Sequence, residues 1–377
     1  MVSIHDLLEL AIRNRASDLF IKAGSPPALR IDGTVIATKL AMLDAADTQE
    51  LAQSIIYTAS RDYLLRFHAP GKEADDIPDL AESQMEHLAE KEEIDLVFTV
   101  PNLVRVRANL FLQQSTVAAA LRIIPLRPFS IEELNLPPVL KELAEVRQGL
   151  ILVAGPTGSG KSTTLAALID HVSSSRHGNI ITVEDPIEYV FEDKSCVIYQ
   201  REVGRDTKTF ASGLRSVLRQ SPDVIMLGEM RDAETMAVAM GAAEMGHLVL
   251  SSIHTNSASA TVERIVNAFQ PHERPQVRSQ LATSLAGVVS QRLLKRQAGH
   301  GRVPAVEIMI NTPSLRKHIE DGNLTEIYST IREGRHFGMN TMNQSLERLV
   351  QAKLITNEDA LMNSGHVQEL RQLLRQS

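Results

Sequence analysis

Residues 150–172 read LILVAGPTGSGKSTTLAALIDHV, and this stretch decides the fold. Within it, residues 155–162 match the pattern GxxxxGK[ST], with an apolar run before the pattern and a helix-forming sequence after it. The glycines let the backbone bend around an anion with its N–H groups pointing inward, and the start of the following helix adds partial positive charge. The stretch therefore predicts a strand, a phosphate-binding loop and a helix.

The loop carries the groups that a nucleoside triphosphate site requires. We expect Lys161 to reach the β- and γ-phosphates and Ser162 to place its hydroxyl on Mg²⁺. ATP and Mg²⁺ are therefore the expected cofactors. The predicted nucleotide-binding residues of the loop are Gly155, Pro156, Thr157, Gly158, Ser159, Gly160, Lys161, Ser162 and Thr163.

Two carboxylate-bearing segments follow apolar runs downstream of the loop, namely EDPIE at residues 184–188 and DVIMLGE at residues 223–229. Ligands of open α/β sheets bind at the carboxyl ends of the strands, where both segments should emerge. Glu229 is the better candidate for acting on magnesium through water, and Glu188 is a candidate for polarising the attacking water. Glu184 is included among the nucleotide-binding candidates, but the sequence does not show which role belongs to Glu184, Glu188 or Glu229.

Two histidines flank the apolar run LVLSSI. His247 and His254 are seven residues apart, and an odd spacing in a strand places two side chains on opposite faces. The pair alone is therefore poor support for a metal site. Thr255 and Asn256 beside His254 at a strand end instead favour a γ-phosphate sensor, an expectation that draws most of its support from the resemblance described below, and we include His247 among the nucleotide-binding candidates.

The pattern around the loop predicts an α/β fold with two domains. From residue 139 onward, buried apolar strands alternate with helices, which indicates a mainly parallel sheet covered on both faces, and the part from about residue 312 reads as helical. Residues 1–125 combine short alternating runs with helical stretches and predict a smaller α+β domain. The proline-spaced residues 126–138 predict a linker between the two.

Charge is concentrated in one segment of the chain. The formal net charge is −7, and residues 73–93 contain nine acidic residues and one lysine, so the rest of the chain carries about +1. This near-neutral body and the absence of Trp argue against binding to nucleic acid. The acidic insertion at residues 70–93 is predicted to be a solvated loop or loose helix, with a docking surface for a basic partner as the alternative.

The remaining composition indicates a cytoplasmic protein. Cys196 is the one cysteine, which excludes a disulfide framework and any zinc site built on several thiolates. The N-terminus MVSIHDLLELAIRNR lacks the features of a signal peptide, and no apolar run approaches the length of a membrane span.

The motifs between Gly155 and His254 resemble those of the secretion-type ATPases that drive pilus machines and type II and type IV secretion. The phosphate loop, the acidic segment 184–188, the segment SPDVIMLGEMRD and the histidine segment 246–254 occur in that family's order and spacing. Within the family, the chain is most similar to the PilT and PilU group of type IV pilus retraction ATPases. The supporting stretches are ASDLFIKAGSPPALRIDG, VRVRANLF, QREVGRDTKTF, GEMRDAET, VSQRLLKR and GMNTMNQSL.

This resemblance implies a RecA-like ATPase domain, a PAS-like N-terminal domain and a homo-hexamer. By position, Arg105, Arg107 and Arg122 match arginines that approach the nucleotide, where a guanidinium can spread transition-state charge. The implied function is ATP hydrolysis that powers pilus retraction and twitching motility. The implied location is the inner face of the cell membrane at the pilus base, with an inner-membrane platform protein and a paralogous pilus motor as partners.

Two alternatives within this resemblance remain open. The chain has Ser115-Thr116 where retraction members usually have Arg-Gly, and SLRKHIEDG where they usually have AIRNLIRE. These departures favour an accessory, weakly hydrolysing ring subunit that modulates a partner motor. The second alternative is a pilus-extension or type II secretion ATPase, which the missing four-cysteine zinc motif disfavours.

Overall fold

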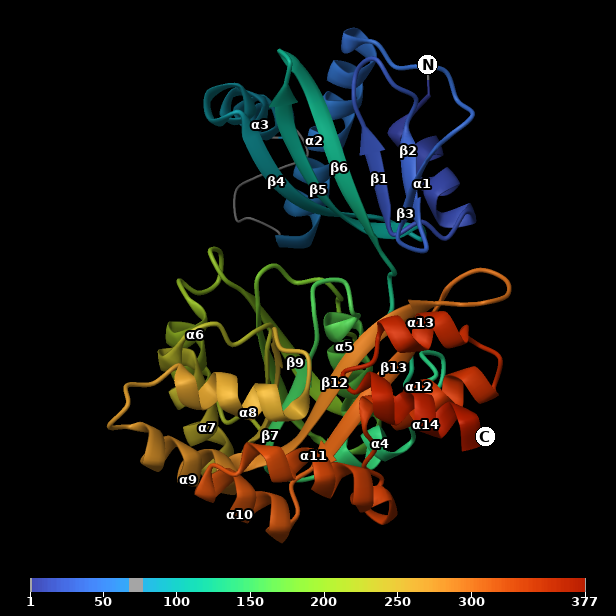
Figure 1. Cartoon of the computed structure of the whole chain (residues 1–377). Coiled ribbons are helices and arrows are strands. Elements are labelled where there is room, and N and C mark those ends of the chain that lie inside the picture. The colour runs from blue at the N-terminus through green and yellow to red at the C-terminus, as the bar shows by residue number, and fades with distance from the viewer. Residues whose placement is uncertain (1, 68–76, 377) are drawn as a thin grey trace. The chain divides into compact units, whose positions relative to one another are not determined.

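The computed structural model describes residues 2–67 and 77–376 and divides the chain into two compact units, Met1–Leu126 and Arg127–Ser377 (Figure 1). Each unit has its own cluster of buried apolar side chains. The boundary lies at Leu126, so residues 127–138 belong to the second unit. Ile131 and Leu136 are buried in its core, which corrects the prediction of a linker over most of this segment.

The second unit is built on a seven-stranded sheet in the order β13-β12-β7-β11-β10-β8-β9. All neighbouring strands are parallel except β12 and β13, which form an antiparallel hairpin. This mainly parallel sheet confirms the predicted α/β fold class. The strands are β7 (Gly149–Ala154), β8 (Gly178–Glu184), β9 (Cys196–Glu202), β10 (Val224–Leu227), β11 (Leu248–Ile253), β12 (Leu285–Lys295) and β13 (Arg302–Ile310).

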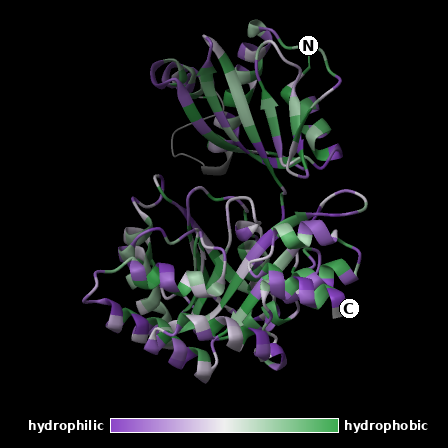
Figure 2. Ribbon diagram, viewed as in Figure 1, coloured by the Kyte–Doolittle hydropathy of each residue, from purple (hydrophilic) through white to green (hydrophobic). Residues whose placement is uncertain are grey.

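Strand β7 is buried at every position because both faces of the sheet are covered. Leu150 and Leu152 face a core that includes side chains of the helices α6 (Phe210–Val217), α7 (Ala233–Glu244), α8 (Ala258–Asn267) and α9 (Arg274–Ser284). Ile151 and Val153 face a second core with α4 (Val139–Ala144) and α5 (Lys161–Ser175). Figure 2 shows the resulting pattern of apolar strands and outward-facing polar helix surfaces.

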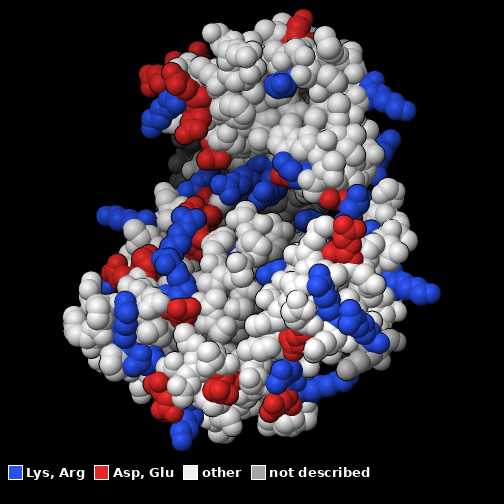
Figure 3. All heavy atoms as spheres, viewed as in Figure 1, with Lys and Arg blue, Asp and Glu red and all other residues white. Residues whose placement is uncertain are grey.

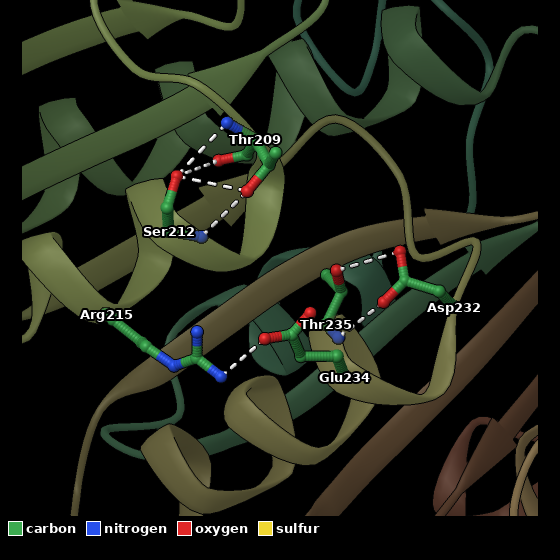
Figure 4. A network of polar contacts seen from close by, with 6 residues as sticks. All are labelled: Thr209, Ser212, Arg215, Asp232, Glu234 and Thr235. Carbon is green, nitrogen blue, oxygen red and sulfur yellow. Dashed lines mark hydrogen bonds and ion pairs between the residues drawn. The ribbon is translucent and has the colours of Figure 1, made fainter.

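The helices α6 and α7 begin at side-chain caps (Figure 4). The Thr209 hydroxyl accepts from the backbone N–H of Ser212 at 3.1 Å, and the Asp232 carboxylate accepts from the N–H of Thr235 at 2.8 Å. An ion pair of 2.6 Å between Arg215 and Glu234 connects the two helices. Such caps satisfy N–H groups that have no partner within the helix.

The chain after β13 is helical. Thr312 caps α10 (Pro313–Asp321), and the following elements are α11 (Leu324–Glu333), the 3-10 turn η2 (Gly334–Phe337), α12 (Met342–Gln351), α13 (Asn357–Met362) and α14 (Val367–Gln376). Met342 and Leu346 on α12 pack with Ala305 of β13 and Leu370 of α14 in a separate small core. The last helices are thus anchored on the β12–β13 hairpin.

Cys196 begins the edge strand β9. Its thiol is buried and donates to the carbonyl oxygen of Arg176 at 3.0 Å. Burial raises the pKa of this thiol. Cys196 is therefore held as an uncharged, structural thiol.

The first unit is an antiparallel sheet of six strands in the order β3-β2-β1-β6-β5-β4, with a core formed by one face of the sheet and three helices. The strands are β1 (Asp18–Ile21), β2 (Ala28–Ile31), β3 (Thr34–Ala37), β4 (Glu93–Val100), β5 (Val104–Gln113) and β6 (Thr116–Ile124), and the helices are α1 (Ile4–Arg13), α2 (Ala45–Phe67) and α3 (Ile77–Lys91). This unit has the α+β composition expected from the sequence, while its PAS-like assignment stays a prediction.

The described part of the acidic segment is mostly helix α3. Ile77 and Leu88 are buried in the first unit, and the acidic side chains of the segment gather over this part of the surface (Figure 3). Residues 70–76 of the predicted insertion lie outside the described residues. Among the helices that the structure describes, none is long and apolar enough to cross a membrane.

Candidate nucleotide-binding site

The phosphate loop lies between β7, which ends at Ala154, and α5, which begins at Lys161. Gly155 has φ +153°, and a Cβ atom there would lie 2.5 Å from the carbonyl oxygen of Gln291. Gly160 has φ +89°, and a Cβ atom there would lie 2.8 Å from Nε2 of the same residue. Both glycines are therefore required by the close approach of β12 to the loop.

Gln291 fixes the loop from the neighbouring strand β12. Its buried side chain donates from Nε2 to the carbonyl oxygen of Ser159 at 2.7 Å and accepts at Oε1 from the Thr164 hydroxyl at 2.8 Å. One amide thus holds both the loop and the first turn of α5. Gln291 is not among the residues predicted from the sequence, although a glutamine within the largely apolar run of β12 is a signal that could have identified it.

Lys161 folds back over the loop. Its ammonium donates to the carbonyl oxygens of Gly155 and Pro156, both at 3.0 Å, and its side chain is largely buried. Burial lowers the pKa of Lys161, while the carboxylates of Glu229 and Glu188 act in the opposite direction. The ammonium therefore lies within the electrostatic influence of both predicted catalytic carboxylates.

The sheet brings most of the predicted residues to one edge. Strands β7, β11, β10 and β8 are consecutive and parallel, so their carboxyl ends lie together. The phosphate loop follows β7, His254 follows β11, Glu229 lies just after β10, and Glu184 is the last residue of β8. Ser162 and Thr163 lie in the first turn of α5 at the same edge, and Glu188 is four residues beyond the end of β8.

Glu229 is the central carboxylate of this edge. Its side chain is 13% exposed, forms a short ion pair with Arg231 and places Oε2 3.5 Å from Nε2 of His254. Burial, followed by the charge of Lys161, lowers the pKa of His254, and Glu229 opposes this effect. Since the ordinary pKa of histidine is already near 6.5, the imidazole is mainly neutral at pH 7.

Glu184 differs from the other two carboxylates because it is buried. Burial raises the pKa of its carboxyl group to about 7, although hydrogen bonds from Thr182 at 2.7 Å and Gln200 at 3.1 Å favour the charged form. Gln200 also donates to the carbonyl oxygen of Tyr189 at 2.8 Å, and the Tyr189 hydroxyl lies 3.2 Å from that of Thr163. Glu184 therefore supports the segment that carries Glu188.

His247 does not join this group. It precedes β11, and its Nδ1 lies 2.8 Å from the carbonyl oxygen of Pro222. A strand of six residues separates it from His254, which is about 20 Å. The structure thus corrects the inclusion of His247 in the nucleotide site of its own chain, because the two histidines lie at opposite edges of the sheet.

The three predicted arginines share one face of the sheet in the first unit. Arg107 and Arg122 are directly opposite each other on β5 and β6, and Arg105 is two residues from Arg107. Their face is the one opposite to the core side chains Val106 and Ala108. Asp18 joins this face, with an oxygen 3.4 Å from Nε of Arg122. Their approach to a nucleotide remains a prediction.

A family model described as "Type II/IV secretion system protein" matches residues 2–377. The chain belongs to this family. The type II/IV secretion system proteins include the ATPases expected from the sequence, and this membership confirms the predicted family and the ATPase activity.

Two relatives and one solved structure illustrate the similarity within the type II/IV secretion system family. The type IV pilus retraction ATPase PilT of Pseudomonas aeruginosa is 42% identical and covers 95% of this chain and 97% of its own length. The type IV pilus ATPase PilU of the same organism is 35% identical, with coverages of 98% and 90%. A crystal structure of the pilus retraction motor PilT with bound ADP has a TM-score of 0.81 at 42% identity, with coverages of 99% and 100%.

Proposed function

We propose that the chain binds ATP at the carboxyl edge of the second unit and uses its hydrolysis to power type IV pilus retraction. The observation that carries this proposal is the meeting of the phosphate loop with Glu229 and His254 at one sheet edge. Similarity to PilT over nearly the whole chain supports the retraction function.

The loop residues fit a magnesium–nucleotide complex. Mg²⁺ prefers oxygen ligands and keeps several waters and phosphate oxygens, so few protein ligands are needed. Within the part of the chain that the structure describes, no group of three or more His, Cys, Asp or Glu side chains could hold a metal by itself. Ser162 would hold the ion directly and Glu229 through water. The bound ion would neutralise charge on the β- and γ-phosphates.

Each remaining residue has a proposed role of its own. Lys161 would place its ammonium on the γ-phosphate, and the loop N–H groups would hold the β-phosphate. Glu188 would orient the attacking water, and the neutral imidazole of His254 would report whether the γ-phosphate is present. Arg105, Arg107 and Arg122 would stabilise charge in the transition state.

Steady-state ATP hydrolysis by the purified chain tests this assignment. We expect Lys161→Ala, Glu188→Gln and Glu229→Gln to lower turnover, the first by at least about 100-fold because the ammonium stabilises developing phosphate charge. Glu326→Gln, an exposed carboxylate on α11, is the matched control. A Lys161→Ala variant that hydrolyses ATP at the wild-type rate would contradict the proposal.

The assembly and partners are part of the same proposal. We propose a homo-hexamer that acts on an inner-membrane pilus platform protein from the inner face of the membrane. Solution mass tests the stoichiometry, since six subunits of 41.5 kDa should be found together. Twitching motility of cells that carry the Lys161→Ala chain as their only copy tests the function, and wild-type motility would contradict it.

The departures at Ser115-Thr116 and at SLRKHIEDG favour one further candidate function, that of an accessory subunit that modulates a partner pilus motor. This alternative predicts that the purified wild-type chain binds ATP with little turnover and raises or redirects the turnover of a second motor. Substantial turnover by the isolated chain would exclude it.

A further inference from the structure

Glu307 is a buried carboxylate outside the nucleotide site. It lies on β13 with 3% of its surface exposed. One oxygen accepts from the backbone N–H of Ala258 at 2.7 Å, and the other oxygen accepts from the backbone N–H of Met342 at 3.4 Å. Ala258 and Met342 are the first residues of α8 and α12. A single side chain therefore binds the starts of two helices.

The physical setting makes this arrangement rigid. N–H groups in the first turn of a helix have no partner within the helix, and each oxygen of Glu307 accepts from one such group. Both bonds are buried, so water cannot replace them. Glu307 therefore sets the position of each helix start relative to the other.

The α8 side of this contact leads to the nucleotide site. His254 lies only four residues before Ala258, and its Nε2 is 3.5 Å from the Glu229 carboxylate. The intervening loop is held to α8 by the Thr255 and Thr261 hydroxyls, which lie 2.6 Å apart. Movement of the α8 start would therefore displace His254.

The α12 side leads to the end of the chain. Asn343, next to Met342, donates from its side chain to the Glu369 carboxylate and to the carbonyl oxygen of His366, both at 2.9 Å. Glu369 is on α14 and also accepts a short hydrogen bond from the Tyr328 hydroxyl of α11. The starts of α12 and α14 are thus held together.

We propose that Glu307 is a positioning residue for ATP hydrolysis. It fixes the position of the loop of residues 254–257, which carries His254, relative to the helices α12 and α14. A displacement of His254 by the γ-phosphate is then transmitted through the α8 start and Glu307 to the C-terminal helices. A displacement of these helices likewise moves His254. This inference rests on the proposed role of His254.

The test is steady-state ATP hydrolysis by the full-length variants Glu307→Gln, His254→Ala and the double variant, with Glu326→Gln as the exposed control. Glutamine keeps the shape of Glu307 but places an NH₂ group against one of the two N–H donors. We expect Glu307→Gln to lower kcat by about tenfold with KM for ATP within about twofold, because misplacement of a catalytic group affects the chemical step. The double variant should fall no further than His254→Ala alone.

A second pair of variants tests the α12 side and keeps the inference open to test if Glu307→Gln fails to fold. Met342→Pro removes this N–H and shortens the buried side chain, at a helix position where proline is favoured, and Thr341 before it is already extended with ψ 163°. Met342→Leu keeps the N–H and controls for the side chain. We expect the proline variant to have a kcat at least about threefold below that of the leucine variant.

The outcomes separate this inference from the proposed function. A Glu307→Gln variant that melts at a lower temperature but keeps the wild-type kcat would overturn the inference, because it would show a purely structural role. Independent effects that multiply in the double variant would also overturn it. If His254→Ala keeps the wild-type rate, the sensor role fails and the inference fails with it. Normal turnover by Lys161→Ala would instead contradict the proposed function itself.

Discussion

Gln291 is the residue whose amide joins the phosphate loop to α5. Replacement by Met keeps a similar length but leaves the Ser159 carbonyl and the Thr164 hydroxyl buried without this partner. We expect Gln291→Met to lower the free energy of unfolding by about 2 kcal/mol and to raise KM for ATP by at least about fivefold. Urea denaturation measures the change in the free energy of unfolding. The dependence of the hydrolysis rate on ATP concentration measures the change in KM.

The exposed Gln297 provides the matched control, since Gln297→Met removes an amide in contact with solvent. Its stability and KM should stay near those of the wild type. An unchanged KM in Gln291→Met would show that the loop keeps its geometry without the amide.

Glu184 should make stability depend on pH. Its carboxyl pKa is about 7 in the folded chain and 4.5 ordinarily, so between these values the folded state keeps a proton that the unfolded state loses. The stabilisation of the folded state by this proton is therefore complete below pH 4.5 and is lost as the pH rises to about 7. We expect the free energy of unfolding of the wild type to fall over this range by about 3 kcal/mol relative to Glu184→Gln.

Urea unfolding of both proteins at several pH values between 5 and 8 measures this difference. Above pH 8 the two curves should run parallel, since Glu184 is then ionised in both states. A difference that stays constant from pH 5 to pH 8 would contradict the raised pKa.

At the scale of elements, the local motifs predict their surroundings well. The strand β7, the loop and α5 follow from one continuous stretch, because glycine spacing and apolar runs encode them locally. The contact of Gln291 with Ser159 joins residues 132 positions apart and depends on strand order, which local patterns do not contain. The separation of His247 from His254, in contrast, is local, because the two residues flank the six residues of β11.

The acidic segment shows a different limit of sequence interpretation. Its composition suggested a solvated loop or loose helix, but residues 77–91 form α3 because Ile77 and Leu88 pack into the first unit. Ala81 and Met85 also pack against this core, so a few apolar side chains on one face dock a helix that is acidic on its other face. A count of charges does not reveal which few residues face the core.

The start of α7 provides a prediction at this scale (Figure 4). Asp232→Ala removes the cap on the Thr235 N–H and should lower the free energy of unfolding by about 1 kcal/mol. Glu234→Gln removes only the exposed pair with Arg215 and should change it by less than about 0.5 kcal/mol. Thermal and urea unfolding of both variants compare the two effects, and equal losses would contradict the assignment of the cap.

For the whole molecule, the predicted catalytic groups are divided between the two units. The phosphate loop and Glu229 belong to the second unit, and the arginine face belongs to the first. We expect Arg107→Gln and Arg122→Gln each to lower turnover by at least about tenfold while ATP binding changes little, because a guanidinium acts mainly on transition-state charge.

Hydrolysis rates and equilibrium ATP affinity measured on the same preparations test this expectation. Arg13→Gln on the exposed end of α1 is the control, since its only loss is a surface pair with Glu9. Wild-type turnover in both arginine variants would restrict the catalytic machinery to the second unit.

The buried thiol of Cys196 has a practical consequence for following such a motor in action. Because the chain has one cysteine and its thiol is buried with a raised pKa, the native protein should react slowly with maleimide reagents. A cysteine introduced at an exposed position of either unit would then be the main site of labelling. Two such cysteines, one in each unit, could thus carry a pair of fluorescent dyes without replacement of Cys196, and the distance between the units could be followed during turnover.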